Sequence, residues 1–288
     1  MAESAYFFGA FFKSNTKERQ IKMKKRIMAI IASAALCLGL CGCKKSSDTD
    51  WDYIKNKGEL VVGITYNMPM NYNDDNGELT GFETEFTNAV CEKLDVKPKF
   101  QVIEWSKKEM ELKSKTIDLV WNGLTVTEDR KKEFLFSKSY MSNKQVTVVK
   151  KENAEKYPDA ASMSSLKIAF EGGSAGEDII KATDALKNVD KNSMTAQKDA
   201  LMEVKAGTSD ACIVDYTLAK AFTKEGSDYD DLTVLDNLGS KSEEYAIGAR
   251  LEDKETIEKI NGAIDELAKD GTLKKIAEKY DLADALLV

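Results

Sequence analysis

Short apolar runs alternate with amphipathic segments along most of the chain. The runs at residues 60–65 and 117–121 have the length and apolar character of buried strands. Between them, residues 82–94 place Phe82 and Phe86 on one face at helical spacing, which predicts an amphipathic helix. Strands that alternate with helices predict an α/β fold with a mostly parallel sheet.

The same alternation continues through the second half of the chain. Further strands are expected at residues 97–103, 145–149, 167–170, 211–214, 232–235 and 245–249. Helices are expected near residues 109–115, 177–188 and 201–205, and two apolar helix faces follow residue 256. The 288 residues suffice for one large domain or two small ones, and we find no internal sequence repeat.

Composition narrows the possible functions. Hydrophobic residues make up 42% of the chain, which is enough for a core, and the net charge of −7 argues against a nucleic-acid partner. The chain has 0 histidines, which excludes a triad with a histidine base and a histidine-ligated metal. Its 5 cysteines form neither a disulfide framework nor a zinc-binding spacing. We therefore expect no cofactor and no metal.

An export signal is predicted near the N-terminus. Residues 23–26 are a basic start, and residues 27–40 are uncharged and apolar but shorter than the roughly 20 residues of a spanning helix. The following Leu40-Cys41-Gly42-Cys43 resembles a bacterial lipobox, in which Cys43 would be lipidated and would begin the mature protein. A plain membrane anchor or a signal without lipid is the alternative.

These features divide the N-terminal region into three parts. Residues 1–22 precede a complete signal and are interpreted as an over-extended gene start. Residues 23–42 are the predicted lipoprotein signal peptide, and residues 43–50 are a polar tether. A second acyl chain would make the attachment to a membrane stable.

The strongest candidate for a binding site follows the strand at residues 117–121. Asn122, Gly123 and Thr125 offer polar atoms and close backbone approach at the strand end, where open α/β sheets bind ligands. Arg130 offers a planar fork of donors that fits a carboxylate. The alternative is structural, with Thr127 capping a helix and Arg130 on its solvated face.

Two further segments have the chemistry of a small-molecule site. The glycine-rich turn at residues 171–176 opens a helix, whose free N–H groups favour an anion, but it lacks the ending of a phosphate loop. Asp215 ends the strand at residues 211–214 and could bind a cationic group or cap the helix that begins at Tyr216.

Five sequence patterns in order resemble the bacterial extracellular solute-binding proteins of family 3, which feed polar amino acids to ABC transporters. The patterns are K-G-E-L-V-V-G-I at 57–64, D-N-G-E-L-T-G-F-E at 75–83, the stretch 117–140 with its T-x-x-R and F-S-x-x-Y motifs, E-Y-A-I-G at 244–248 and D-G-T-L-K-K-I at 270–276. The resemblance implies a two-lobed, periplasmic-binding-protein-like (type II) fold with a two-strand hinge, formed by crossing strands near residues 145–149 and 245–249. Lobe 1 would contain residues 51–144 and 246–288, and lobe 2 residues 145–245.

The resemblance also implies roles for individual residues. Arg130, Thr125 and the helix start at Ser174 and Ala175 would hold the carboxylate of a free amino acid. Asp215 would pair with its ammonium group. The other expected ligand contacts are Asn122, Gly123, Trp105, Thr65 and Met68.

The segment at residues 65–70 departs from the family pattern. The family usually has an acidic or polar residue followed by an aromatic one, whereas this chain is one residue short and has Met68 or Asn67 at the aromatic position. Thr65 stands where receptors for basic amino acids often carry aspartate. A cationic ligand side chain is therefore disfavoured by the sequence.

The resemblance implies a lipid-anchored monomer on the extracellular face of the cytoplasmic membrane, or in the periplasm if an outer membrane is present. It would close on one amino acid and deliver it to an ABC transporter permease. A sensory ligand-binding protein is one alternative. The other is a dehydratase-like enzyme on the same fold, which would need an acid or base such as Glu104, Glu109 or Glu171; we expect no enzyme.

Overall fold

A computed structural model describes residues 49–288 of the chain. The predicted gene start, signal peptide and lipidated Cys43 lie outside the described residues, as does most of the predicted tether. Among the helices of residues 49–288, none combines the length and the apolar character that crossing a membrane requires.

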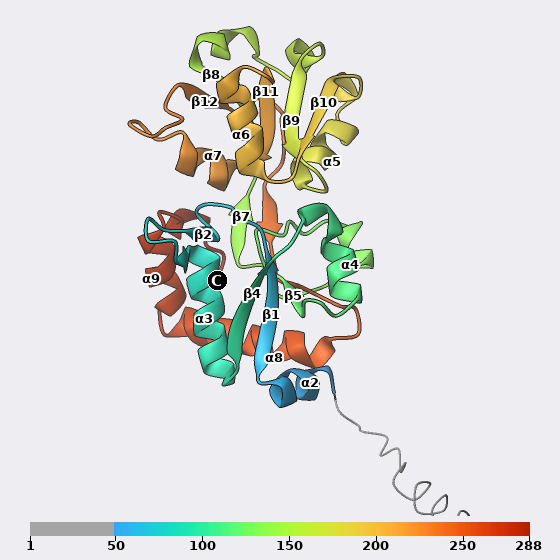
Figure 1. Cartoon of the computed structure of the whole chain (residues 1–288), viewed down its shortest axis with the longest axis vertical. Helices are drawn as coiled ribbons and strands as arrows, with labels where there is room; N and C mark the ends of the chain where they lie inside the picture. The colour runs from blue at the N-terminus through green and yellow to red at the C-terminus, as the bar shows by residue number, and fades with distance from the viewer. Residues whose placement is uncertain (1–48) are drawn as a thin grey trace, which may run out of the picture. The chain divides into compact units, whose positions relative to one another are not determined.

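The first of two five-stranded sheets has the strand order β4-β1-β5-β14-β6, and its strands β4, β1 and β5 are labelled in Figure 1. Strands β4 and β5 run parallel to β1, whereas β14 runs antiparallel to β5 and β6. The strands are β1 (Glu59–Ile64), β4 (Lys97–Val102), β5 (Leu119–Val120), β6 (Leu135–Phe136) and β14 (Gly248–Ala249). A short hairpin of β2 (Tyr72–Asn73) and β3 (Leu79–Thr80) lies outside this sheet.

The second sheet has the order β10-β9-β11-β8-β12. Strands β10 and β11 run parallel to β9, and β8 runs antiparallel to β11 and β12. The strands are β8 (Gln145–Lys150), β9 (Lys167–Glu171), β10 (Asp190–Met194), β11 (Ala211–Asp215) and β12 (Leu232–Leu235). In both sheets the antiparallel strand is fourth in the order, so the two halves share one topology.

Helices of the first lobe pack around an apolar core. Phe82, Phe86 and Val90 of the helix predicted at residues 82–94 are fully buried, and this helix contacts the two helices near the C-terminus. The helices are α2 (Asp50–Lys57), α3 (Phe82–Leu94), α4 (Lys108–Lys113), α8 (Lys254–Lys269) and α9 (Thr272–Lys279). Burial of this amphipathic face supplies the main driving force for the lobe.

The second lobe has its own apolar clusters, formed by residues of its sheet and three helices. The helices are α5 (Ala175–Ala182), α6 (Gln197–Ala206) and α7 (Tyr216–Phe222). Cys91 in the first lobe and Cys212 in the second are both buried and free, as expected of core thiols.

Two short strands join the sheets. Strands β7 (Met141–Asn143) and β13 (Glu243–Tyr245) pair antiparallel, and we call them the hinge pair. They begin a few residues before the predicted crossing segments at 145–149 and 245–249, because β8 and β14 already belong to the two sheets. The C-terminus adds to this region, since the Leu287 N–H donates to the Tyr140 carbonyl at 2.9 Å.

Two helix predictions need correction. The helix that Thr127 was considered to cap is only a 3-10 turn at Arg130–Lys132, because the chain must re-enter the sheet at β6. The helix expected at 177–188 ends at Ala182, where the extended backbone of Thr183 breaks it, and a 3-10 turn follows at Asp184–Leu186. The remaining 3-10 turns are Trp105–Lys107, Lys151–Lys156, Ala161–Met163 and Ala283–Ala285.

Candidate functional site

Arg130 lies at the facing ends of the two lobes. Its side chain is only 8% exposed, although its 3-10 turn is on the surface. Nη1 donates to the Thr125 carbonyl at 3.0 Å, and Nη2 donates to the Gly173 carbonyl of the second lobe at 3.2 Å. The solvated position considered from the sequence is therefore wrong, and Arg130 is a buried cation that connects the lobes.

Lys108, which the sequence did not single out, reaches the same place. Its ammonium donates to the Gly173 carbonyl at 3.0 Å and lies 5.0 Å from the centre of the Trp105 ring. Burial lowers the pKa of Lys108, and the charge of Arg130 lowers it further. Two cations of the first lobe thus share one carbonyl acceptor of the second.

The loop after β5 is held by side chains of neighbouring segments. The Asn122 side-chain amide makes two hydrogen bonds with Thr65. It accepts from the Thr65 hydroxyl at 2.6 Å and donates to the Thr65 carbonyl at 3.0 Å. Gly123 adopts φ +59° and donates its N–H to Glu83 at 2.9 Å. The predicted contacts Asn122, Gly123 and Thr65 therefore form one hydrogen-bonded unit, with Thr125 next to it.

Glu83 is a buried organiser of this unit. Its carboxylate accepts from Gly123 N, from Asn71 Nδ2 at 2.9 Å and from the Tyr140 hydroxyl. Burial raises the pKa of the Glu83 carboxyl to about 7 against the effect of these hydrogen bonds. One side chain of helix α3 thereby fixes the loop after β5 and the residue before the hinge pair.

The glycine-rich turn of the second lobe ends in a regular helix start. Ser174 is the N-cap of α5, and its hydroxyl accepts from the Glu177 N–H at 3.2 Å. Ala175 follows as the first helical residue, and both residues are at most 8% exposed. The opposed lobe thus presents the buried N-terminus of a helix, where an anion is favoured.

Asp215 is buried at the end of β11, with 4% of its surface exposed. Its carboxylate accepts from amide groups of Asn143 at 2.9 Å and Gln145 at 2.5 Å, and also from Gln197. It makes no side-chain cap to helix α7. The capping alternative is therefore wrong, and burial raises the pKa of Asp215 despite the amide donors.

Two more acids lie near Asp215. Glu243 of the hinge pair accepts from Asn143 and Gln145, each at 2.6 Å. Glu171 ends β9, is 3% exposed, and its Oε1 has no hydrogen-bond partner among the described residues. Burial and the charge of Asp215 raise the pKa of Glu171 to about 8, against the opposing charge of Lys108.

The remaining predicted contacts differ in exposure. Trp105 is 4% exposed and packs in the core cluster around β5, so only part of its surface is available. Met68 is half-buried in the segment between β1 and β2. Glu104 is exposed and paired with Lys107, which does not suit an acid or base aimed at a ligand.

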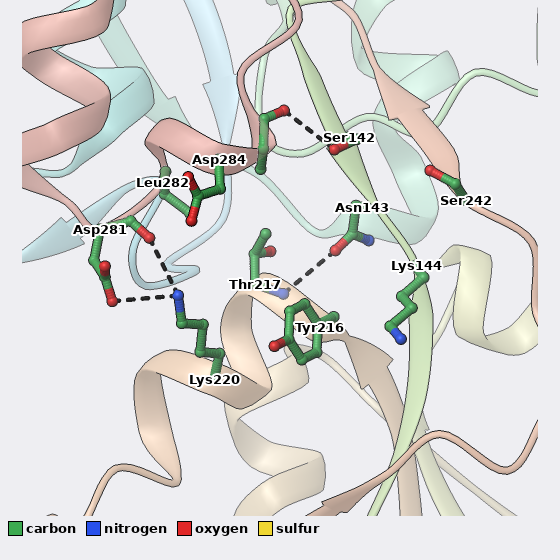
Figure 2. Close-up of a pocket in the computed structure, with 11 residues that line it drawn as sticks. Ser142, Asn143, Lys144, Tyr216, Thr217, Lys220, Ser242, Asp281, Leu282 and Asp284 are labelled. Carbon is green, nitrogen blue, oxygen red and sulfur yellow. Dashed lines mark hydrogen bonds and ion pairs between the residues drawn. The ribbon is translucent and has the colours of Figure 1, made fainter.

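The candidate residues coincide neither with a metal-binding cluster of the described residues nor with a cavity beside the hinge pair. In residues 49–288, no group of three or more candidate side chains is placed to hold a metal ion. A cavity of about 350 Å³ lies beside the hinge pair, where Figure 2 shows Asn143 with Tyr216, Lys220 and Asp281. None of the residues predicted to bind ligand lines this cavity.

Buried charged side chains of both signs thus lie at the facing ends of two α/β lobes. The model of bacterial extracellular solute-binding proteins, family 3, matches residues 60–283. The chain belongs to this family, and its two lobes have the type II periplasmic-binding-protein-like fold that the resemblance implied.

Known relatives match over nearly their whole length. The chain is 32% identical to the probable amino-acid-binding protein YxeM of Bacillus subtilis (strain 168), covering 90% of this chain and 96% of that protein. It is 28% identical to the L-cystine-binding protein TcyJ of Escherichia coli (strain K12), covering 91% of this chain and 96% of that protein. A Streptococcus pneumoniae ABC uptake transporter substrate-binding protein, solved with bound histidine, is 31% identical with a TM-score of 0.76, covering 82% and 97%.

Proposed function

We propose that this protein is the substrate-binding component of an amino acid ABC transporter and binds one free amino acid between its lobes. The observation that carries the proposal is the separation of charge in the site. Arg130 and Lys108 of the first lobe face the N-terminus of α5, while Asp215 lies at the end of β11. A zwitterion needs both kinds of partner, since an unpaired buried charge costs several kcal/mol.

Arg130 and the α5 N-terminus would bind the carboxylate. The guanidinium already donates to two carbonyls, and its planar fork can exchange these weak acceptors for a carboxylate. Thr125, Ser174 and Ala175 would complete this half of the site. Asp215 would accept from the ammonium group, with Asn122 and Gly123 beside it and Trp105, Thr65 and Met68 around the ligand side chain.

The ligand would act as a bridge that closes the lobes about the hinge pair. Lobe 1 would contain residues 51–144 and 246–288, and lobe 2 residues 145–245. We propose that the ligand leaves unchanged, because the proteins reported above are named as binding proteins and Glu104 is held by Lys107.

We further propose that Cys43 carries lipid and holds the protein at the extracellular face of the membrane, next to its permease. The support is the basic start at residues 23–26, the short apolar stretch and the L-C-G-C sequence. The monomer would then deliver its amino acid directly to the transporter.

A thermal-shift panel tests the proposed function. The protein is heated with each standard amino acid, with L-cystine, and with matched analogues lacking either the ammonium or the carboxylate. A specific ligand at 100 times its Kd stabilises the protein by about 2.7 kcal/mol. We expect one amino acid or a narrow group to raise the Tm and both analogues to fail. A panel in which no amino acid raises the Tm would contradict the proposal.

A further inference from the structure

Asp215 and Glu243 share their hydrogen-bond donors. Asn143 Nδ2 lies 2.9 Å from Asp215 Oδ1 and 2.6 Å from Glu243 Oε1. Gln145 Nε2 lies 2.5 Å from the same aspartate oxygen and 2.6 Å from the same glutamate oxygen. Two oxygens that contact the same two nitrogens must be close neighbours, so we call these acids the Asp215–Glu243 pair.

The shared donors are neutral amides with fixed orientations. Figure 2 shows that the Asn143 carbonyl oxygen accepts from the Thr217 N–H, at 3.3 Å, which leaves its NH₂ group for the pair. On the other side of Asp215, Gln197 accepts from the Asp215 N–H at 2.8 Å and donates to its carboxylate. Neutral donors stabilise one carboxylate, but they do not cancel the charge of a second one beside it.

Within residues 49–288, no lysine or arginine forms an ion pair that would neutralise this second carboxylate. None of the ion pairs formed there includes Asp215, Glu243 or Glu171. Arg130 is engaged by two carbonyls and by Asp178 at 3.4 Å. The buried Glu171, whose Oε1 has no partner in the described part of the chain, adds a third acid near Asp215. The region therefore holds three acidic side chains that no lysine or arginine of the described residues pairs with.

Several titratable groups act on the pair. Burial and the charge of Asp215 raise the pKa of Glu243 to about 7, while the two amides and the charge of Arg130 act in the opposite direction. Tyr245 on the hinge pair, Glu171 on β9 and Glu83 on α3 are acids that interact with Asp215, and Lys108 acts on Glu171. Without a cationic ligand, the pair therefore holds a proton for part of the time near neutral pH.

Building on the proposed function, we propose that Asp215 and Glu243 together receive the ammonium group of the amino acid and release a proton to solvent as it binds. The proton leaves the carboxyl O–H of the pair for water or buffer. The ammonium keeps all its protons and donates them to the two carboxylates. One positive charge enters beside the Asp215–Glu243 pair as one proton leaves it, so this half of the site gains no net charge. The carboxylate of the amino acid enters the other half, where Arg130 would bind it. Glu243 also joins the ligand to strand β13 of the hinge pair.

Titration calorimetry near neutral pH, in buffers of low and high ionisation enthalpy, measures this proton. The full mature protein is titrated with L-arginine, L-glutamine and L-cystine, which lack an imidazole. We expect a release of roughly half a proton per bound amino acid, because a group with a pKa near the solution pH is half protonated. The released fraction should rise as the pH is lowered.

Glu243→Gln and Glu244→Gln are matched variants on the same strand. The amide introduced by Glu243→Gln keeps an oxygen for the two amide donors but cannot hold the exchangeable proton, whereas Glu244 is exposed beside it. We expect Glu243→Gln to abolish the proton release and to weaken binding by about tenfold or more above neutral pH. Glu244→Gln should retain the proton release and the binding strength of the wild type.

The outcomes separate this inference from the proposed function. Tight binding without proton release, or unchanged release in Glu243→Gln, overturns the inference and leaves the binding function standing. Failure of all three amino acids and of the wider thermal-shift panel overturns both.

Discussion

Buried charge at single residues marks the candidate site more clearly than sequence position does. Position at a strand end suggested Asp215, and a T-x-x-R motif suggested Arg130, but each also had a structural explanation. In the fold both side chains are less than a tenth exposed, and neither occupies the capping or solvated role that was the alternative. Burial decides between these readings, and burial depends on the second lobe, which no local pattern shows.

Two further residues of the candidate site could not be found from the sequence. Lys108 opens a helix whose charged sequence is typical of a solvated helix, yet its ammonium donates to the Gly173 carbonyl of the other lobe. Glu243 is the first residue of a charged strand, and nothing distinguishes it from Glu244 until the fold places Asn143 and Gln145 beside it. Both depend on contacts between residues far apart in sequence.

The raised pKa values of Glu83 and Glu171 predict how stability depends on pH. Burial raises the pKa of Glu83 from 4.5 to about 7 and the pKa of Glu171 from 4.5 to about 8. Between the ordinary pKa and the raised pKa of each group, the folded protein binds more protons than the unfolded chain. The stability of the ligand-free protein therefore falls as the pH rises through this range. Each group contributes at most about 1.4 kcal/mol per pH unit.

Chemical unfolding at a series of pH values checks this prediction. Glu171→Gln should reduce the slope and raise stability at the alkaline end, whereas the exposed Glu104→Gln should leave the slope unchanged. A ligand-free protein that becomes more stable between mildly acidic and mildly alkaline pH would contradict the assignment.

At the scale of elements, strands were predicted better than helix ends. Apolar runs such as residues 60–65 and 211–214 correspond closely to β1 and β11, because a fully buried strand leaves a continuous apolar signal. The predicted lengths of two helices were wrong: the segment after Thr127 forms only a 3-10 turn, and α5 ends at Ala182. Both segments stop early because the chain returns to its sheet. The loop after β5 was located from sequence, but its links to Thr65 and Glu83 were not.

Gly123 gives an element-scale prediction for this loop. Its φ is +59°, and a Cβ there would lie 3.3 Å from the Tyr245 ring. Gly123→Ala should therefore lower the free energy of unfolding by about 1–3 kcal/mol, from backbone strain and crowding together. Gly226 has a φ of +76° with open space around it, so Gly226→Ala should cost only about 1 kcal/mol. Denaturant unfolding measures the free energy of unfolding of both variants. Equal losses of stability would contradict a contribution from crowding against the Tyr245 ring.

At the scale of the whole molecule, the two lobes repeat one strand order without a sequence repeat. Each sheet takes its fourth strand, β8 or β14, from a segment next to the hinge pair. Composition and periodicity predicted an α/β protein, but the family resemblance was needed to predict the two lobes. The reason is that pairing between distant strands leaves no local signal.

The hinge gives a prediction for the particle in solution. An amino acid that bridges the lobes should shift the population toward a more compact state. Solution scattering on saturation with the amino acid selected by the thermal-shift panel should therefore give a smaller radius of gyration. An unchanged radius with a confirmed ligand would count against closure about the hinge pair.

The predicted lipid anchor gives a prediction for the cell. Cys43→Ser removes the thiol that would be acylated, so the protein should move from the membrane fraction to the soluble fraction. Cys91→Ser is the matched control, because Cys91 is a buried thiol far along the chain and should not affect fractionation. Wild-type protein that is soluble, with residues 23–42 still attached, would exclude the anchor.

Titration calorimetry of Arg130→Lys and Asp215→Asn with the preferred amino acid tests the central claim most directly. Lysine keeps the charge but loses the fork, and asparagine keeps the shape but loses the charge. Removing one partner of a buried charge pair costs about 2–5 kcal/mol, so each variant should bind roughly 30-fold to several thousand-fold more weakly. The neighbouring exposed Lys131→Arg should bind as the wild type does. If both variants bind within about threefold of wild type, less than one net hydrogen bond is worth, the amino acid is not held between Arg130 and Asp215.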